Sequence, residues 1–499
     1  MTTTQPGYGD LPATQDELGF APSATALTEI VLGAELADTP LTVGVYGPWG
    51  SGKTSLMKMI YRNLNDPEKP QPGVLPIWFD AWRYVQSDAL WRALLISVVE
   101  EIRVRVVRNE DRLRTLVGRR ATTAGQVPPQ DLRAEQASLE KRLDDLAASL
   151  YRSVDREDQG AIEFQWGKAG KLAAGTIIRA GFSYIPVLGK ISEAVAKAKE
   201  GLGEQAYADT LLDLFQRERT LIYRDQVQSL EQFYAGLKEL IEEWAEQAGY
   251  RLVIFIDDLD RCLPEQAIGV LEAIKVFLDI QGCIFVLGVD REIIERGIRV
   301  RYKEFALAGA AAGVFPVAER DYLEKIVQIP FALPPLALHT MSAFLRSRLP
   351  GVPGLTASDA DHVATLMAVG LLRNPRKVKR SFNIFRLHLS LDRAHGRQTA
   401  AGLIAKLTVI QTSFADLYER IARDPTLLKG IEVIARGTPT RDTIDPKLRD
   451  DVGSQDPRLK EMLYLEPFFE KLDDNTLREL VYQSRVTGEA ATDGGGTSS

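Results

Sequence analysis

At 499 residues the chain is long enough for more than one domain, and its 45% hydrophobic and 26% charged residues are ordinary for a soluble globular protein. The formal net charge of -7 argues against a generic nucleic-acid coat, although a local basic patch is compatible with it. Only Cys262 and Cys283 are present, which excludes a disulfide framework and a thiolate metal cluster.

The N-terminal segment, residues 1–22, is expected to be a flexible polar tail. Its first residues, Met1 to Asp10, lack the basic-then-apolar pattern of a secretion signal, so we expect a cytoplasmic protein. A helix is predicted over residues 24–36. The apolar run from Leu41 to Tyr46 is a predicted strand.

A glycine-rich motif follows this strand directly. Residues 47–54 read Gly-Pro-Trp-Gly-Ser-Gly-Lys-Thr and lead into a predicted helix at 55–60, which is the context of a phosphate-binding loop, or P-loop. Backbone N–H groups that point inward at a helix N-terminus form an anion site. Lys53 would reach the β- and γ-phosphates, and the Thr54 hydroxyl would bind Mg²⁺. We therefore predict nucleotide binding by Gly47, Pro48, Trp49, Gly50, Ser51, Gly52, Lys53, Thr54 and Ser55.

A second strand is predicted at residues 74–79. It ends in the sequence Trp-Phe-Asp-Ala-Trp, in which we assign Trp78 and Trp82 to the core and expect Asp80 to face the nucleotide. Helices are predicted at 89–107, 205–222 and 229–248, and residues 108–160 are rich in charged residues and alanine.

Residues 171–191 come nearest to the length and apolar character of a membrane span. Arg179, Pro186 and Lys190 interrupt this segment. A packed helix pair, an interfacial segment in peripheral contact with a membrane, and a docking face for a partner all remain open.

Two continuous apolar strands, at 252–256 and 283–289, predict a parallel sheet that is buried on both faces. Asp257 ends the first of them and is predicted to be the Walker B aspartate, which would hold Mg²⁺ together with Thr54. Asp258 would orient or deprotonate the attacking water. Asp260 is a weaker third candidate.

Two further polar residues follow these strands. Asp290, after the second strand, would either sense the γ-phosphate or cap the helix that begins at Arg291. Arg261 is expected to form a structural ion pair with the acids beside it.

The C-terminal part of the sequence is predicted to be helical from residue 336, after a possible strand within 325–331. A basic cluster at residues 373–380 opens one helix. It has three interpretations: it supplies an arginine to the γ-phosphate, it contacts nucleic acid, or it is a solvated helix face.

We thus expect an α/β nucleotide-binding domain with a long helical insertion, followed by a helical domain. The predicted divisions are 1–22 (tail), 23–107 and 251–335 (the two parts of the P-loop domain), 108–250 (helical insertion), 336–486 (helical domain) and 487–499 (disordered tail).

The chain resembles the KAP-type P-loop NTPases. The matching motifs are the P-loop at 47–54, Trp-Phe-Asp-Ala-Trp at 78–82, Ile-Asp-Asp-Leu-Asp-Arg-Cys at 256–262, Phe-Val-Leu-Gly-Val-Asp-Arg at 285–291, Tyr-Leu-Glu-Lys-Ile-Val-Gln-Ile-Pro-Phe at 322–331 and Asn-Pro-Arg-Lys-Val-Lys-Arg at 374–380. Asp80 departs from the family pattern, which usually has asparagine there. The membrane helices common in the family have no clear counterpart here.

The resemblance implies an ATPase of the additional-strand class, in which the Walker B strand lies apart from the strand that precedes the P-loop. It implies catalytic roles for Lys53, Asp258 and Arg376, where Arg376 is the candidate arginine sensor acting in its own chain or in a neighbouring one. It also implies Mg²⁺ at Thr54 and Asp257. Bacterial relatives are associated with defence against phage or plasmids.

The leading hypothesis is an enzyme that hydrolyses ATP with Mg²⁺ and acts as a nucleotide-driven switch on a protein partner or within a homo-oligomer. A GTPase would carry an Asn-Lys-x-Asp guanine motif, which is absent from the sequence. A small-molecule kinase, an ATP-binding scaffold that does not hydrolyse ATP, and a nucleic-acid-associated motor remain as alternatives.

Overall fold

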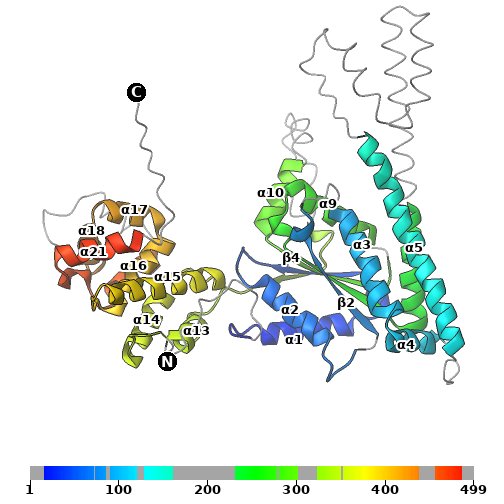
Figure 1. The fold of residues 1–499 in the computed structure, drawn as a ribbon, viewed down its shortest axis with the longest axis horizontal. Helices are drawn as coiled ribbons and strands as arrows, with labels where there is room; N and C mark the ends of the chain where they lie inside the picture. Colours follow the sequence, from blue (N-terminus) through cyan, green and yellow to red (C-terminus); the bar gives the residue numbers. More distant parts are fainter. Residues whose placement is uncertain are drawn as a thin grey trace, which may run out of the picture.

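The computed structural model describes residues 16–71, 73–85, 90–120, 129–160, 231–277, 280–301, 323–349, 352–437 and 456–485. In this part of the chain, an α/β unit is followed by a bundle of C-terminal helices (Figure 1). The segment 171–191 and the predicted helix at 205–222 lie outside the described residues. None of the described helices has the length and apolar character that crossing a membrane requires.

The described strands form one five-stranded sheet, and every pair of neighbouring strands is parallel. Their order is β2-β3-β4-β1-β5. Since β4 separates β3 from β1, the strand that ends in Asp257 is not adjacent to the strand that precedes the P-loop. This confirms the predicted additional-strand arrangement. The strands are β1 Leu41–Tyr46, β2 Val74–Asp80, β3 Arg251–Asp257, β4 Cys283–Val289 and β5 Ile329–Ala332.

The α-helices with defined bounds in the α/β unit are α1 Ala21–Gly33, α2 Lys53–Leu64, α3 Leu90–Ile102, α4 Glu110–Arg120, α5 Pro129–Gly160, α9 Pro264–Phe277 and α10 Arg291–Arg301. The corresponding C-terminal helices are α13 Leu338–Arg348, α14 Ala357–Gly370, α15 Pro375–Ala394, α16 Ala401–Ser413, α17 Ala415–Arg423, α18 Leu427–Ala435, α20 Pro457–Tyr464 and α21 Asp474–Ser484. Residues 231–248 are also helical.

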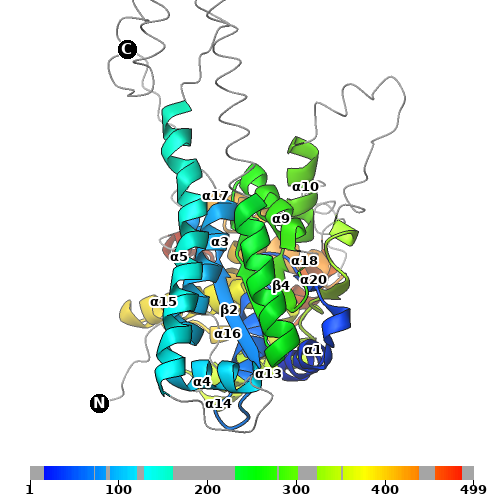
Figure 2. The same cartoon turned by 90° about the vertical axis from the view of Figure 1, so that its right-hand side faces the viewer.

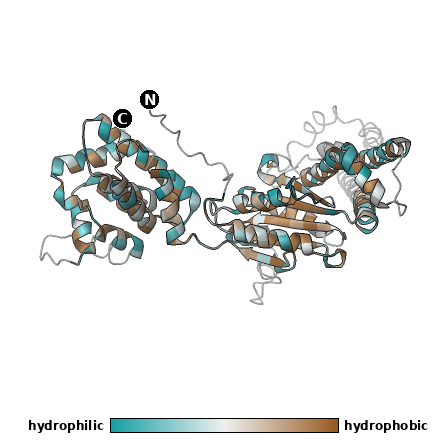
Figure 3. Cartoon of the chain, turned by 90° about the horizontal axis from the view of Figure 1, so that it is seen from below, coloured by the Kyte–Doolittle hydropathy of each residue, from teal (hydrophilic) through white to brown (hydrophobic). Residues whose placement is uncertain are grey.

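Helices cover both faces of the sheet. Because successive strand residues point to opposite sides, each strand contributes side chains to two cores. Leu252, Ile254 and Ile256 belong to the core shared with α3 and α9. Val253 and Phe255 belong to the core shared with α1 and α2. Figure 2 shows α3, α5 and α9 on one side, and Figure 3 shows the strands as a hydrophobic layer between more polar helices. Burial on both faces explains the uninterrupted apolar runs in the sequence.

The C-terminal helices enclose a separate hydrophobic core that includes Phe382, Leu407 and Met462. Two polar features lie inside it. The ammonium group of Lys406 lies 2.8 Å from a carboxylate oxygen of Glu432, and both side chains are 0% exposed. The ring of His388 shares a 3.1 Å hydrogen bond with the Thr408 hydroxyl.

Two predicted helices have different ends in the structure. Helix α1 begins at Ala21 and ends at Gly33, instead of spanning 24–36. The Asp16 carboxylate accepts hydrogen bonds from the N–H groups of Phe20 and Ala21 at 2.9 and 2.7 Å, which fixes the chain before the helix. The predicted helix at 89–107 is α-helical only to Ile102 and continues as one π-helical segment over Arg103–Val107.

Candidate nucleotide-binding site

The P-loop lies between β1 and α2, and its shape depends on glycine. Gly50 and Gly52 have φ angles of 79° and 109°, in the region that side chains disfavour. A Cβ atom added to Gly50 would lie 2.8 Å from the Cβ of Arg376. One added to Gly52 would lie 2.6 Å from the ring of Phe20. Both the backbone conformation and the close approach of Arg376 and Phe20 therefore require glycine at these positions. The contact with Phe20 was not predicted from the sequence.

Lys53, the first residue of α2, is engaged within the site. Its ammonium group donates hydrogen bonds to the Gly47 carbonyl and to the Asp260 carboxylate, both at 2.9 Å. The Lys53 and Asp260 side chains are 6% and 2% exposed. Asp260 was only a third candidate from the sequence, but it is the carboxylate that contacts the P-loop lysine.

Thr54 and Asp257 come together from α2 and β3. The Thr54 hydroxyl donates to an Asp257 carboxylate oxygen at 3.2 Å. A Cβ atom at Gly288 in β4 would lie 3.0 Å from that oxygen and 2.5 Å from the Met57 sulfur, so glycine leaves the space for both. Burial, and to a lesser degree the neighbouring Asp258, raise the pKa of Asp257 to about 6.

These residues fit a Mg²⁺ ion in the presence of a nucleotide. Mg²⁺ prefers oxygen ligands and is usually held by one or two protein groups together with phosphates and water. Thr54 and Asp257 supply two such groups. Among the described residues, no cluster of three or more His, Cys, Asp or Glu side chains could hold a metal ion alone. The buried Ser51 hydroxyl in the P-loop has no hydrogen-bond partner within this part of the chain, as expected of a cradle that binds phosphate.

Asp258 lies beside this pair in an unusual backbone conformation. Its φ of 58° makes it the one non-glycine residue with positive φ among the described residues. Such strained residues cluster at functional sites. Its carboxylate lies 2.9 Å from the Nε of Arg261, which is the ion pair expected from the sequence. Burial raises the pKa of the Asp258 carboxyl.

Asp80 ends β2 directly opposite Asp257 and pairs with Arg83 at 3.1 Å. The sequence placed Trp78 and Trp82 in the core, and this is wrong for Trp82, which is 55% exposed. The chain enters a 3₁₀-helix over Ala81–Tyr84, which ends the strand alternation before Trp82. Trp78 is partly buried and stacks on Phe255, with 5.5 Å between ring centroids.

Asp290 directly follows β4 and accepts a hydrogen bond from the N–H of Glu292 at 3.1 Å. This contact matches the helix-capping interpretation of Asp290, since α10 begins at Arg291.

The start of α15 touches the P-loop. The Asn374 side-chain amide donates to the Trp49 carbonyl at 2.8 Å, and its oxygen accepts the N–H groups of Arg376 and Lys377 at 3.1 and 3.3 Å. The Arg376 guanidinium lies 4.5 Å from the centroid of the Trp49 ring. Arg376 therefore lies next to the P-loop of its own chain. Of the remaining basic cluster, Lys377 and Arg380 are exposed.

Comparison with known proteins finds a matching family model and similar proteins. The model of the KAP family P-loop domain matches residues 20–391. The phage T7 exclusion protein of Escherichia coli (strain K12) is 23% identical over 386 residues, which cover 75% of this chain and 41% of that protein. A structure of the Aeropyrum pernix ORC2 protein (ADPNP-ADP complexes) aligns over 95% of both chains with 14% identity and a TM-score of 0.32.

The family match spans most of the chain and contains every residue of the site described above. The chain covers less than half the length of the phage T7 exclusion protein. With its P-loop between β1 and α2, and Asp257 at the end of a strand that is not adjacent to β1, this protein belongs to the KAP family of P-loop NTPases.

Proposed function

We propose that the protein hydrolyses ATP with Mg²⁺ and uses the reaction as a switch. The observation that carries this proposal is that Lys53 and Thr54 contact Asp260 and Asp257, respectively, although more than 200 residues separate the two acids from the P-loop. A phosphate-binding loop and a buried acid on a separate strand are the two parts that NTP hydrolysis requires.

Each side chain has a distinct role in this proposal. The P-loop N–H groups and Lys53 neutralise the β- and γ-phosphates. Thr54 and Asp257 hold Mg²⁺, which would shield the charge of the phosphates. Asp258 orients the attacking water and accepts its proton, in keeping with a pKa that burial raises.

The switch is proposed to operate through the contact between α15 and the P-loop. Asn374 and Arg376 contact the backbone or ring of P-loop residues, and α15 continues into the core of the helical bundle through Phe382 and Phe385. A change in P-loop geometry on hydrolysis would therefore move the first turn of a helix that is fixed in the bundle.

ATP turnover by the full chain tests the proposal. Lys53→Ala should remove turnover by weakening nucleotide binding. Asp258→Asn should lower turnover roughly 100-fold or more while nucleotide binding persists, since proton transfer contributes on that scale. Unchanged turnover in Lys53→Ala would remove the proposed site.

A non-hydrolysing ATP-binding scaffold is the second candidate, and the Asp258–Arg261 ion pair favours it. The Arg261 guanidinium, 2.9 Å from the Asp258 carboxylate, lowers the pKa of Asp258 against the effect of burial and occupies the group that would accept the proton of the water. If wild-type protein binds ATP without turnover and Arg261→Ala gains no turnover either, the scaffold function holds.

The biological role is proposed from the similarity to the phage T7 exclusion protein. We propose that the chain takes part in excluding phage. Expression of the wild type should lower the plaque count of a sensitive host, and Lys53→Ala should restore it. Equal protection by the wild type and by Lys53→Ala would show that phage exclusion does not depend on nucleotide binding.

We also propose that nucleotide controls assembly with a protein partner or with further copies of the chain. Because Arg376 lies beside its own P-loop, it is proposed to act within one chain. The mass of the native particle, measured with and without a slowly hydrolysed ATP analogue, tests for nucleotide-dependent assembly.

A further inference from the structure

A second candidate binding site lies in the C-terminal helices. A hollow of about 360 Å³ opens between the end of α17 and the last turns of α21. Figure 1 shows α17 and α21 in the C-terminal bundle, apart from the sheet. The residues that line the hollow are not part of the P-loop site.

Positive charge dominates this hollow. Arg423 ends α17, Arg478 lies on α21, and Arg485 follows α21 directly. All three are exposed, and none of them pairs with an acid within the described part of the chain. Asp424 is the only acid among the described residues of the lining. Its carboxylate already accepts hydrogen bonds from the N–H and hydroxyl groups of Thr426 at 3.1 and 2.5 Å.

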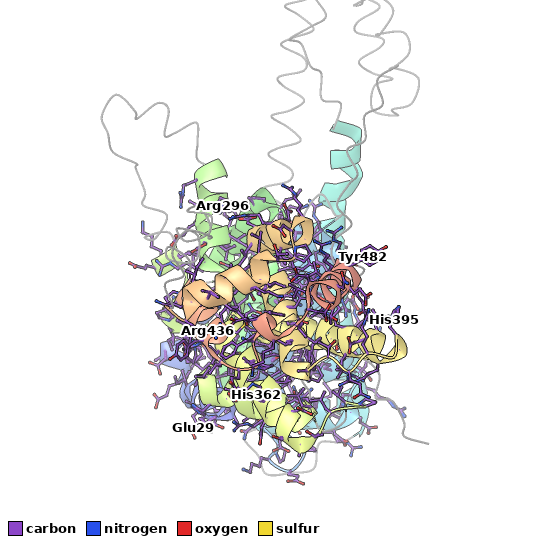
Figure 4. The ribbon with its side chains drawn as sticks, turned by 90° about the vertical axis from the view of Figure 1, so that its left-hand side faces the viewer. Glu29, Arg296, His362, His395, Arg436 and Tyr482 are labelled. Carbon is purple, nitrogen blue, oxygen red and sulfur yellow. The ribbon has the colours of Figure 1, made fainter. Side chains whose placement is uncertain are left out.

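Tyr482 adds an aromatic surface to the same hollow. Its side chain is 73% exposed, and Figure 4 shows it on α21 at the edge of the bundle. An exposed large ring next to arginines is the combination on which nucleic-acid bases stack while their phosphates are neutralised.

The walls of the hollow are fixed by the core beneath it. The buried Tyr418 hydroxyl on α17 shares a 2.7 Å hydrogen bond with the Ser484 hydroxyl on α21. Gln411 on α16 donates to the Ser484 carbonyl at 2.9 Å. Val481, which lines the hollow, is fully buried. The arginines therefore project from helices whose spacing is already set, which lowers the entropic cost of binding.

We propose that this hollow binds a nucleoside phosphate, with the base stacked on Tyr482 and the phosphate held by Arg423, Arg478 and Arg485. Its volume lies in the range of small-molecule sites. Guanidinium groups match the geometry of phosphate oxygens. A free mononucleotide and one nucleotide of a single-stranded nucleic acid present the same chemistry, so both are sources of the ligand.

Calorimetric titration of the full chain tests this proposal. The probes are AMP, a single-stranded thymidylate of about ten nucleotides and inorganic phosphate. AMP lacks the β- and γ-phosphates that Lys53 is proposed to hold, and each titration is repeated in Lys53→Ala. Binding at the hollow is thereby separated from the proposed ATPase site.

We expect AMP or the thymidylate to bind saturably, and Arg478→Ala/Arg485→Ala and Tyr482→Ala to weaken that binding about tenfold each. Lys460→Ala/Lys471→Ala removes the same charge from exposed positions of the bundle outside the hollow and should have no effect. The replaced pocket side chains are exposed, so the variants should fold; Arg478→Gln/Arg485→Gln keeps polar side chains as a second test.

Tighter binding of AMP would identify a free nucleotide as the ligand, and tighter binding of the thymidylate would identify a single strand. Three results would overturn the proposal: no binding of either probe, equal weakening by the lysine control, or binding of inorganic phosphate as tight as that of AMP and the thymidylate with no effect of Tyr482→Ala.

Discussion

The ammonium group of Lys53 lies 2.9 Å from a carboxylate oxygen of Asp260, and both side chains are buried. A phosphate that is bound by Lys53 must compete with this carboxylate for the same ammonium group. The ion pair therefore links the stability of the nucleotide-free protein to its affinity for nucleotide.

The variant Asp260→Asn tests this competition. Without nucleotide we expect its unfolding free energy to fall by about 3–5 kcal/mol, because a buried ammonium group loses its counter-charge. The stabilisation by a slowly hydrolysed ATP analogue with Mg²⁺ should exceed that of the wild type. Thermal unfolding with and without the analogue measures both effects.

Asp290→Asn is the matched control for this variant. Asp290 also follows a strand of the sheet, but its carboxylate accepts the capping hydrogen bond from the N–H of Glu292. The nucleotide-induced stabilisation of Asp290→Asn should equal that of the wild type. An unchanged or smaller nucleotide effect in Asp260→Asn would contradict competition for Lys53.

Asn374 has two functions that substitution can separate. Asn374→Ala removes the helix cap and the donor to Trp49, and should destabilise the bundle by about 1 kcal/mol. Asn374→Asp keeps an oxygen that caps α15 but removes the donor. If the contact with the P-loop transmits the nucleotide state, Asn374→Asp should retain stability and lose nucleotide-dependent assembly. Denaturant unfolding and particle mass report the two properties, and assembly at wild-type level in Asn374→Asp would argue against this contact.

The contact between Arg376 and Trp49 should be visible by fluorescence. Trp49 is 58% exposed, and the guanidinium lies over its ring. Nucleotide binding at the P-loop should shift the emission of Trp49, obtained as the difference between the wild type and Trp49→Phe. Arg376→Ala should reduce this shift, since the cation–π contact contributes about 0.5–1 kcal/mol at an exposed position. No nucleotide-dependent difference would show that Trp49 does not sense the site.

In the buried pair of Lys406 and Glu432, a double substitution should cost less stability than a single one. Lys406→Met leaves the Glu432 carboxylate without its counter-charge and should cost about 3–5 kcal/mol. Lys406→Met/Glu432→Gln should be less destabilised, because glutamine still accepts the N–H of Phe469. Denaturant unfolding measures the stability of both variants, and a double variant that is as unstable as Lys406→Met or less stable would contradict this prediction.

His388 predicts a specific loss of stability in acid. Burial lowers the pKa of His388 from 6.5 to about 4. As the pH falls, the unfolded chain therefore binds a proton before the folded chain does. The contribution of this group is complete above pH 6.5 and is lost progressively down to about pH 4, by about 3 kcal/mol in total. His388→Asn should lose correspondingly less between these pH values in denaturant unfolding, and equal losses would exclude His388 as the cause.

Local patterns in the sequence predicted the P-loop and the strand that ends in Asp257. Both depend on neighbouring residues: glycines that permit the turn, and apolar runs that are buried on both faces. The position of β4 between β1 and β3 followed from the family resemblance, since no local pattern encodes strand order.

The partners of the site residues were harder to predict. Asp257, Asp258 and Asp260 lie within four positions of one another, and the sequence does not indicate which of them contacts Lys53. The 3₁₀ turn after β3 directs Asp260 to Lys53. The contact of Asn374 with Trp49 joins residues 325 positions apart, and nothing near Asn374 in the sequence specifies it. Trp82 was misplaced because a short 3₁₀-helix replaced the expected alternation.

Binding of a nucleoside triphosphate together with Mg²⁺ by residues 47–54 underlies the proposed function. It is tested most directly by the Kd of a slowly hydrolysed ATP analogue, measured with and without Mg²⁺. The matched variants are Lys53→Ala and Lys58→Ala, in which Lys58 lies farther along α2 and faces Trp78. We expect saturable binding that Mg²⁺ strengthens, that Lys53→Ala weakens about tenfold or more, and that Lys58→Ala leaves unchanged. Equal affinity in the wild type and Lys53→Ala would contradict it.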